Sequence, residues 1–360
     1  MRVTPRRALA AAAIAALLGF IVYWSGVVPI GAAGGHWRIT DLVLHTAMRR
    51  SVAFHAPEEV PQGFGAAAQV RRGAGHFEQG CASCHGSPLR PRGAVPRAMV
   101  PEPPDLTGRV DDWTAGELYW IVANGVKFTG MPAWPAPDRH DEAWSLAAFL
   151  QRLPGMSRED YRALAFGKVE PDAPLPGPFA ALLADCARCH GLDGVGDASG
   201  AFPRLDIQPR PVLRAALEAY AQGRRASGIM QTAVRDLHLE ELAALADHYA
   251  RLGPQRRTPP LAAGDVPIEL LERGEHIARE GLASRDVAAC TGCHGSAARD
   301  DFPVIAGQYR DYLVTQLQLF AGEIDRGGGR FLDLMTLAAH TLGPDEIEAV
   351  AAWYASRSAP

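Results

Sequence analysis

The apolar and polar positions of this chain follow a helical period over most of its length. Two apolar faces show the period best, and the second repeats the first at an offset of 105 residues: Leu242, Leu245, Ala246 and Tyr249, then Ile347, Val350, Ala351 and Tyr354. Positions i, i+3, i+4 and i+7 form one face of a helix. A looser counterpart spans residues 141–153. Sustained alternation, which is typical of strands, is almost absent, so the pattern predicts an all-α fold.

The N-terminal segment is uniformly apolar instead of periodic. Residues 8–30 carry no ionisable side chain except Tyr23, and residues 1–7 supply three arginines. A run of this length can span a bilayer with its basic end on the cytoplasmic side. A cleaved signal peptide is the alternative, because residues 31–33 are small. We favour an uncleaved anchor, since the run exceeds the usual ~7–15 residues of a signal core.

A segment of mixed polarity follows this apolar run. Residues 36–57 combine Trp37, Leu42 and Val43 with Arg38, Arg49 and Arg50. The mixture suits a helix that lies along the lipid headgroups, and it suits equally a helix that docks on protein.

One pentapeptide occurs three times and uses every cysteine of the chain. Its copies are Cys81-Ala-Ser-Cys84-His85, Cys186-Ala-Arg-Cys189-His190 and Cys290-Thr-Gly-Cys293-His294. In each copy the two thiols are placed to add to the two vinyl groups of one haem, and the adjacent histidine is then held beneath the iron. The motif therefore predicts three covalently attached haem c groups, with His85, His190 and His294 as the proximal ligands.

Other meanings of a Cys-x-x-Cys pair fit less well. The pair can be half of a zinc site, a thioredoxin-like redox pair or two core residues, but none of these predicts a histidine after all three copies. A zinc site also needs four ligands within one domain, whereas these pairs lie 105 and 104 residues apart. Disulfides are excluded by count if all three sites are filled.

The recurrence of the motif also predicts the domain organisation. A length of 360 residues with a period near 105 favours three units after the anchor. Pro- and Gly-rich linkers at 171–178 and 253–260 separate them. Gly73 and Gly274, upstream of two motifs, would let a helix approach its partner closely. We expect an anchor at 1–35, a juxtamembrane segment at 36–64, and haem domains at 65–170, 171–257 and 258–360.

The second axial ligand of each iron is predicted from methionine positions. An electron carrier needs an iron whose two axial positions are both filled by protein. Met230 is the only methionine between His190 and the next linker. Met335, the only methionine after His294, lies 105 residues further on. Each precedes a leucine by seven residues and then the last helix of its unit. This repetition favours ligands over ordinary core methionines.

The first unit offers Met99, Met131 and Met156 as the ligand. Met131 lies 46 residues after His85, against 40 and 41 residues in the other units, so we favour Met131. Rival histidine ligands share no common position relative to the motif; they are His140, His238 and His340. We also expect each proximal imidazole to donate its other ring N–H to a backbone carbonyl, for which Pro203 and Pro303 are candidates.

These residues resemble class I c-type cytochromes, and residues 179–357 resemble the dihaem cytochrome c4 family. The resemblance rests on Cys-Ala-Arg-Cys-His-Gly with Phe202-Pro203-Arg-Leu, and on Cys-Thr-Gly-Cys-His-Gly with Phe302-Pro-Val-Ile-Ala-Gly-Gln308 and Tyr309-Arg-Asp-Tyr312-Leu. It implies that His190 and Met230 ligate one haem and that His294 and Met335 ligate the next. The first unit is similar to single-haem domains with a Gly-Met-Pro-Ala-Trp-Pro loop, which places Met131 on its iron. The family also implies attachment outside the cytoplasmic membrane.

The expected function is the relay of single electrons in a periplasmic respiratory chain, without bond chemistry on a substrate. The chain would be a single-pass protein of the bacterial inner membrane, with its three class I cytochrome c domains in the periplasm. A haem enzyme such as a dihaem peroxidase is the alternative, but it requires an open iron site, and three methionines argue against one. The cytochrome subunit of a membrane alcohol or sugar dehydrogenase is a further alternative.

The charge distribution limits the choice of partners. The chain has a formal net charge of -4, and residues 258–360 carry 15 acidic against 8 basic side chains. Such a surface can steer a basic partner, although most charge excesses are only solvated. The sequence has no basic stripe of the kind that binds nucleic acid. We expect the inner membrane and redox proteins as partners: a terminal oxidase, a dehydrogenase, or a small cytochrome or cupredoxin.

Overall fold

The computed structural model describes residues 4–28, 30–108, 110, 112–168, 180–196, 199–255, 260–295, 299–322, 326 and 331–360. Within these ranges the regular elements are helices, and one isolated bridge joins Leu282 to Val287. The all-α prediction is confirmed. The predicted linker 171–178 and residues 256–259 of the second linker lie outside the described residues.

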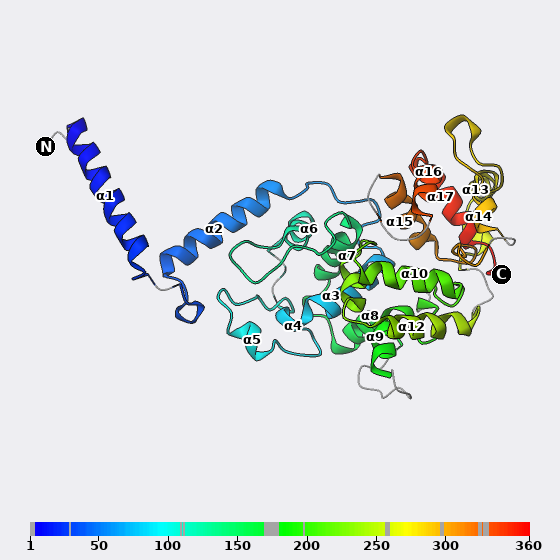
Figure 1. The fold of residues 1–360 in the computed structure, drawn as a ribbon, viewed down its shortest axis with the longest axis horizontal. Helices are drawn as coiled ribbons and strands as arrows, with labels where there is room; N and C mark the ends of the chain where they lie inside the picture. The colour runs from blue at the N-terminus through cyan, green and yellow to red at the C-terminus, as the bar shows by residue number, and fades with distance from the viewer. Residues whose placement is uncertain are drawn as a thin grey trace.

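The apolar N-terminal segment forms helix α1 (Pro5–Ser25), which stands apart from the other helices (Figure 1). None of its residues is buried, and its mean hydropathy of 2.0 is high enough for it to cross a membrane. The helix begins three residues before the predicted run and ends at Ser25, with Gly26 as its C-cap. Gly26 takes φ +68°, a left-handed conformation that glycine adopts without strain and that ends helices. A short 3-10 turn, Ala32–Gly34, follows.

Helix α2 (Arg38–His55) docks on protein with its C-terminal half. Val52 is fully buried, the His55 ring stacks on Trp120 at 5.7 Å between centroids, and the Arg49 guanidinium lies 4.6 Å from the Trp113 ring. Around its N-terminus, several large apolar side chains are exposed: the N-cap Trp37, and Ile39, Leu42 and Val43 within the helix. The docked-helix alternative therefore holds for the second half of α2.

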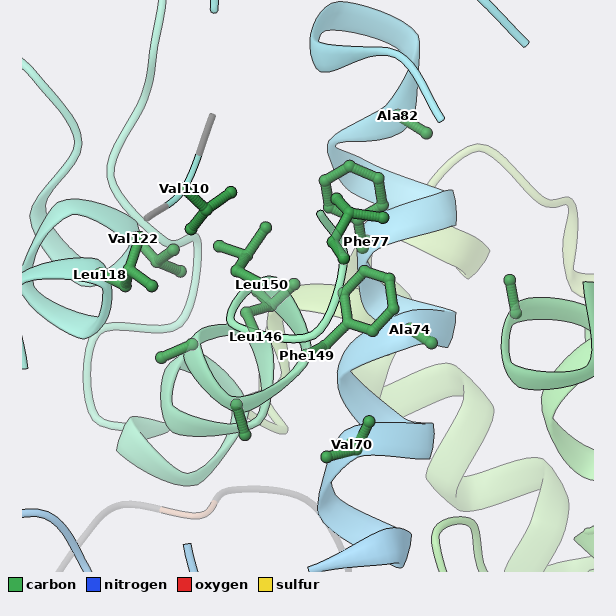
Figure 2. Close-up of a cluster of buried hydrophobic side chains, with 14 of the residues drawn as sticks. Val70, Ala74, Phe77, Ala82, Val110, Leu118, Val122, Leu146, Phe149 and Leu150 are labelled. Carbon is green, nitrogen blue, oxygen red and sulfur yellow. The ribbon is translucent and has the colours of Figure 1, made fainter. Parts of the chain in front are cut away.

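The first core lies between the helices that flank the first motif. These helices are α3 (Ala67–Gly80), α4 (Ala82–His85), α5 (Ala94–Arg97), α6 (Ala115–Asn124), α7 (His140–Leu150) and α8 (Arg158–Phe166). Phe77 on α3 meets Phe149 on α7 at 5.4 Å between ring centroids (Figure 2). Gly73 permits this approach, because a Cβ there would lie 2.0 Å from the Ser145 carbonyl oxygen.

A smaller core supports the second motif. Its helices are α9 (Ala180–His190), α10 (Arg210–Ala221), α11 (Gly228–Val234) and α12 (Leu239–Leu252). All four members of the predicted apolar face on α12 are buried, with exposed fractions of 1–3%. Leu213 on α10 packs against this face. The helical assignment and its inward face are confirmed.

The third core repeats the plan of the first around the last motif. Its helices are α13 (Ile268–Glu280), α14 (Thr291–His294), α15 (Arg310–Ala321), α16 (Leu332–Ala339) and α17 (Pro344–Ala355), with short 3-10 turns at Ala263–Asp265 and Ala283–Arg285. Gly274 on α13 touches α17, since a Cβ there would lie 2.1 Å from the Ala349 carbonyl oxygen. The close approaches predicted for Gly73 and Gly274 are both confirmed.

Candidate haem sites

Each Cys-x-x-Cys-His motif ends as a helical turn. In the first motif, the Cys81 N–H donates to the Phe77 carbonyl at 2.8 Å, and the His85 N–H donates to the Cys81 carbonyl at 2.9 Å. Side chains at i, i+3 and i+4 share one face of such a turn, so both thiols and the imidazole are presented together. Gly86 then takes φ +75° and redirects the chain.

The three motif histidines make the same contact with a proline carbonyl. Nδ1 lies 2.9 Å from the Pro104 oxygen in His85, 3.4 Å from the Pro203 oxygen in His190 and 2.9 Å from the Pro303 oxygen in His294. A carbonyl can only accept, so Nδ1 carries the proton and Nε2 presents its lone pair. The predicted acceptors Pro203 and Pro303 are confirmed, whereas Pro104 was not anticipated.

Burial favours the uncharged forms of the motif histidines and cysteines. Burial lowers the pKa of His190 to about 4 and lowers those of His85 and His294 too, so each ring is neutral and able to bind metal. It raises the pKa of Cys81 and Cys186 to about 12. A thioether carries no charge and has no such burial cost. The residues therefore fit a covalently held haem.

The aromatic neighbours of the second and third histidines also repeat. Phe202 meets the His190 ring edge-on at 6.2 Å between centroids, and Phe302 meets the His294 ring at 6.4 Å. Each phenylalanine directly precedes the proline that accepts from its histidine. Within the described ranges, no three or more His, Cys, Asp and Glu side chains gather as a separate metal-binding group.

The candidate methionines lie in two kinds of setting. Met230 is in α11 and Met335 in α16, whereas Met131 lies in a loop where its carbonyl accepts from the Val126 N–H at 3.1 Å. All three are half-buried. The rival histidines, His140, His238 and His340, are exposed.

Met99 lies beside the Met131 loop, a neighbourhood that spacing did not reveal. A Cβ on Gly130 would lie 2.0 Å from the Met99 methyl carbon and 3.7 Å from its sulfur. Met156 packs on the side of the first core instead. The pairing of methionine and histidine around an iron remains a prediction.

The second motif packs directly on the first unit. Arg71 on α3 donates to the Arg188 carbonyl at 2.9 Å, and its guanidinium lies 4.9 Å from the Phe202 ring. A Cβ on Gly75 would lie 3.0 Å from Phe202 and 3.3 Å from the Cys189 sulfur. The second attachment site is therefore within van der Waals reach of α3.

The second and third units meet through a reciprocal pair of amides. Gln308 binds both polar groups of the Arg204 peptide, at 2.8 and 3.0 Å. Gln208 binds both polar groups of Val304 in the same way, at 3.1 and 2.7 Å. Arg204 and Val304 each follow the proline that accepts from a motif histidine. The contact therefore joins the proximal sides of two candidate haem sites.

Parts of the chain are similar to known proteins. The family model described as cytochrome c oxidase, cbb3-type, subunit III matches residues 68–150. The thiosulfate dehydrogenase electron acceptor of Thiomonas intermedia is 30% identical over 188 residues, which cover 51% of this chain and 84% of that protein. The cytochrome c4 of Thiocapsa roseopersicina is 32% identical over 173 residues, which cover 46% of this chain and 83% of that protein.

Among solved structures, cytochrome c4 of Acidithiobacillus ferrooxidans is 28% identical, with a TM-score of 0.41 over 48% of this chain and 99% of that chain. The chain covers more than two thirds of the length of both sequence relatives, and each is at least 30% identical to it. The chain therefore belongs to the c-type cytochromes, haem c proteins of electron transfer, and about half of it is related to the dihaem cytochrome c4 proteins.

Proposed function

We propose that this chain is a membrane-anchored cytochrome with three covalent haems that relays single electrons between redox proteins outside the cytoplasmic membrane. One observation supports three haems in particular. In every copy of the motif, a proline carbonyl accepts a hydrogen bond from Nδ1 of the histidine, which leaves Nε2 free to bind iron. We assign one haem each to residues 65–170, 171–257 and 258–360. Haem, when bound, supplies a one-electron iron centre.

The protein's own part is to hold each iron from both sides. We assign Met131, Met230 and Met335 opposite His85, His190 and His294. A thioether paired with an imidazole raises the reduction potential relative to two imidazoles, and it keeps small molecules off the metal. Such a site suits electron transfer and disfavours peroxide chemistry.

The contacts between units support a relay along the chain. α3 of the first unit touches the second attachment motif, and the amide pair of Gln208 and Gln308 ties the second proximal side to the third. Electron tunnelling falls steeply with distance, so sites whose attachment segments are in contact suit successive steps. We propose that electrons pass through the units in spatial order.

Helix α1 supports a single-pass anchor in the inner membrane. It is 21 residues long, exposed throughout and close to the N-terminus, although a signal sequence would share these properties. A retained helix would keep the haem domains near membrane partners at a high effective concentration. The exposed apolar half of α2 would then lie beside the bilayer.

One related protein and the matched family model suggest the partners. One matched protein is named a thiosulfate dehydrogenase electron acceptor, and the matched family model is named for a subunit of a terminal oxidase. We propose a dehydrogenase of that class as the donor, and a terminal oxidase or a small soluble carrier as the acceptor.

Mass spectrometry and visible spectra of the exported full chain test the haem count and ligation. We expect the mass of three added haems and low-spin ferric spectra with the weak methionine–sulfur band at the red end. Met230→Ala and Met335→Ala should each lower the potential of one haem without loss of covalent attachment. An apoprotein mass would refute haem attachment, and a high-spin ferric signal with peroxide turnover would refute the carrier function.

A separate assay tests the donor. Thiosulfate and a purified thiosulfate dehydrogenase are mixed with the oxidised cytochrome, and the reduced haem band is followed in time. Reduction that requires both the enzyme and thiosulfate supports the proposed donor. No reduction above that seen with the enzyme alone contradicts it, while leaving the haem assignment intact.

A further inference from the structure

Glu142 is a buried carboxylate at the boundary between the first and second units. Only 2% of the residue is exposed, and it lies near the start of α7. Its Oε2 accepts from the Trp134 Nε1–H at 2.9 Å. Across the boundary, its Oε1 accepts from the Ser227 hydroxyl at 2.6 Å, and Oε2 accepts from the Gly228 N–H at 2.8 Å. The Arg139 guanidinium lies 3.1 Å from Oε1.

Trp134, Ser227 and Gly228 each belong to a segment that carries a candidate axial methionine. Trp134 is three residues after Met131 in the same loop. Ser227 is the N-cap of α11, and its hydroxyl oxygen accepts from the Met230 N–H at 3.2 Å. One carboxylate therefore binds the loop of the first methionine and the helix start of the second.

The two segments also touch each other directly over this carboxylate. A Cβ on Gly228 would lie 2.4–2.6 Å from three atoms of the Trp134 indole, so only glycine leaves room for the ring. The buried His76 ring also stacks on the Trp134 ring, at 6.1 Å between centroids. Trp134 is thus fixed by packing as well as by its hydrogen bond.

Burying a carboxylate is costly unless donors and a countercharge surround it. Glu142 has three hydrogen-bond donors and Arg139, whose Nη1 also donates to the Ala226 carbonyl at 2.8 Å. Removing the carboxylate would leave buried donors on both methionine segments without their acceptor. A packing role alone would not need this set of donors.

We propose that Glu142 is a positioning residue that fixes the Met131 loop and the Met230 helix relative to each other, and so sets the methionine ligation of the first two haems together. The inference rests on the His/Met relay proposed above. Glu142 touches neither methionine; it acts through Trp134, Ser227 and Gly228.

The physical consequence is a shared effect on two reduction potentials. A displaced thioether binds iron less well, and its loss lowers the potential. A tenfold change in the ratio of thioether affinities for the two iron oxidation states corresponds to about 59 mV for a one-electron couple. Met335, the candidate ligand of the third haem, is on α16, and none of the contacts described for Glu142 involves this helix.

The test compares variants of the full-length holoprotein by redox titration and by the methionine–sulfur band. Met131→Ala, Met230→Ala and Met335→Ala assign each potential to its haem. We expect Glu142→Ala to shift the first two potentials by the equivalent of at least a tenfold affinity change and to weaken the band. Trp134→Phe should shift mainly the first potential, and Ser227→Ala mainly the second.

Glu78→Gln is the matched control. Glu78 is also buried, accepts from the Tyr161 hydroxyl at 2.6 Å and pairs with Arg90, but its contacts lie away from both methionine segments. It should lower stability and leave the potentials in place. If Glu142→Ala does not fold, Glu142→Gln keeps the shape and should shift the same two potentials less. Unchanged potentials in Glu142→Gln, Trp134→Phe and Ser227→Ala would overturn the inference. A wild type without the methionine–sulfur band would refute the proposed ligation instead.

Discussion

Gln308 holds the peptide of Arg204 from both sides: its Oε1 accepts from the Arg204 N–H at 2.8 Å, and its Nε2 donates to the Arg204 carbonyl at 3.0 Å. Both residues are 1% exposed. A side-chain amide is the group that can pair with a peptide in this way, because it offers one acceptor and one donor side by side. The Arg204 backbone, which follows the acceptor of the His190 ring, is therefore fixed by the third unit.

Gln308→Leu should destabilise the contact between the second and third units. Leucine keeps much of the volume but removes the hydrogen-bond partner of the Arg204 N–H, the Arg204 carbonyl and the Tyr309 N–H, which costs about 2–4 kcal/mol. We expect the free energy of unfolding, measured by urea denaturation of the holoprotein, to fall by that amount. Gln318→Leu, on the exposed face of α15, is the control and should change stability little. Equal stabilities of the two variants would show that the amide pair contributes nothing.

The sequence predicted this region in part. The Phe-Pro segments after the second and third motifs identified the carbonyls that bind His190 and His294, since their order repeats within the chain. Pro104 was missed because several prolines follow the first motif and the acceptor lies 19 residues after His85 instead of 13 or 9. Local patterns locate groups whose partners are near in sequence.

Long-range contacts were beyond the reach of the same reasoning. In the sequence, Glu142 is one of many acidic residues near the start of a helix, where acidic side chains are common. Its hydrogen-bond donors on the second unit, however, lie 85 and 86 residues away. Met99 likewise has no sequence relation to the Met131 loop that it touches. Both features arise from how units and loops pack, which periodicity and motif spacing do not encode.

Gly274→Ala should be strongly destabilising. The added methyl group would lie 2.1 Å from the Ala349 carbonyl oxygen and 2.8 Å from the Trp353 Cβ, so α13 and α17 must separate. Overpacking of this kind costs about 1–3 kcal/mol and can cost more where backbone is the obstacle. Thermal unfolding of the holoprotein measures the loss. Gly264→Ala has open space around its Cβ and should change the midpoint little; a similar loss there would mean that the effect is not steric.

Met131→Ala and Met99→Ala should distinguish the two neighbouring methionines that are candidate ligands of the first haem. We expect Met131→Ala to remove one third of the methionine–sulfur band and to lower one potential, because the haem would lose its thioether. Met99→Ala should keep the band and at most lower stability through a small cavity. The reverse outcome would assign Met99 to the iron. Met99 is the alternative because it lies against Gly130, the residue next to Met131.

His76 should make the protein less stable in acid. The residue is 5% exposed, and burial lowers its pKa to about 3, with Arg72 and Arg139 lowering it further and Asp141 opposing them. The unfolded chain has the ordinary value of 6.5 and therefore binds more protons between pH 6.5 and 3. Stability is then complete above pH 6.5 and is lost as the pH falls through this window. From pH 7 to pH 5 the loss due to His76 is about 2 kcal/mol.

His76→Phe should remove this contribution, because phenylalanine keeps a planar ring against Trp134 and takes up no proton. The measurement is urea denaturation of wild type and variant at pH 7 and pH 5, with His45→Phe on the exposed face of α2 as the control. Wild type and control should lose more stability between the two pH values than His76→Phe does. Other groups titrate in the same window, so the difference between variants, and not the absolute loss, isolates His76. An identical pH dependence in all three proteins would mean that His76 is not buried as a neutral ring.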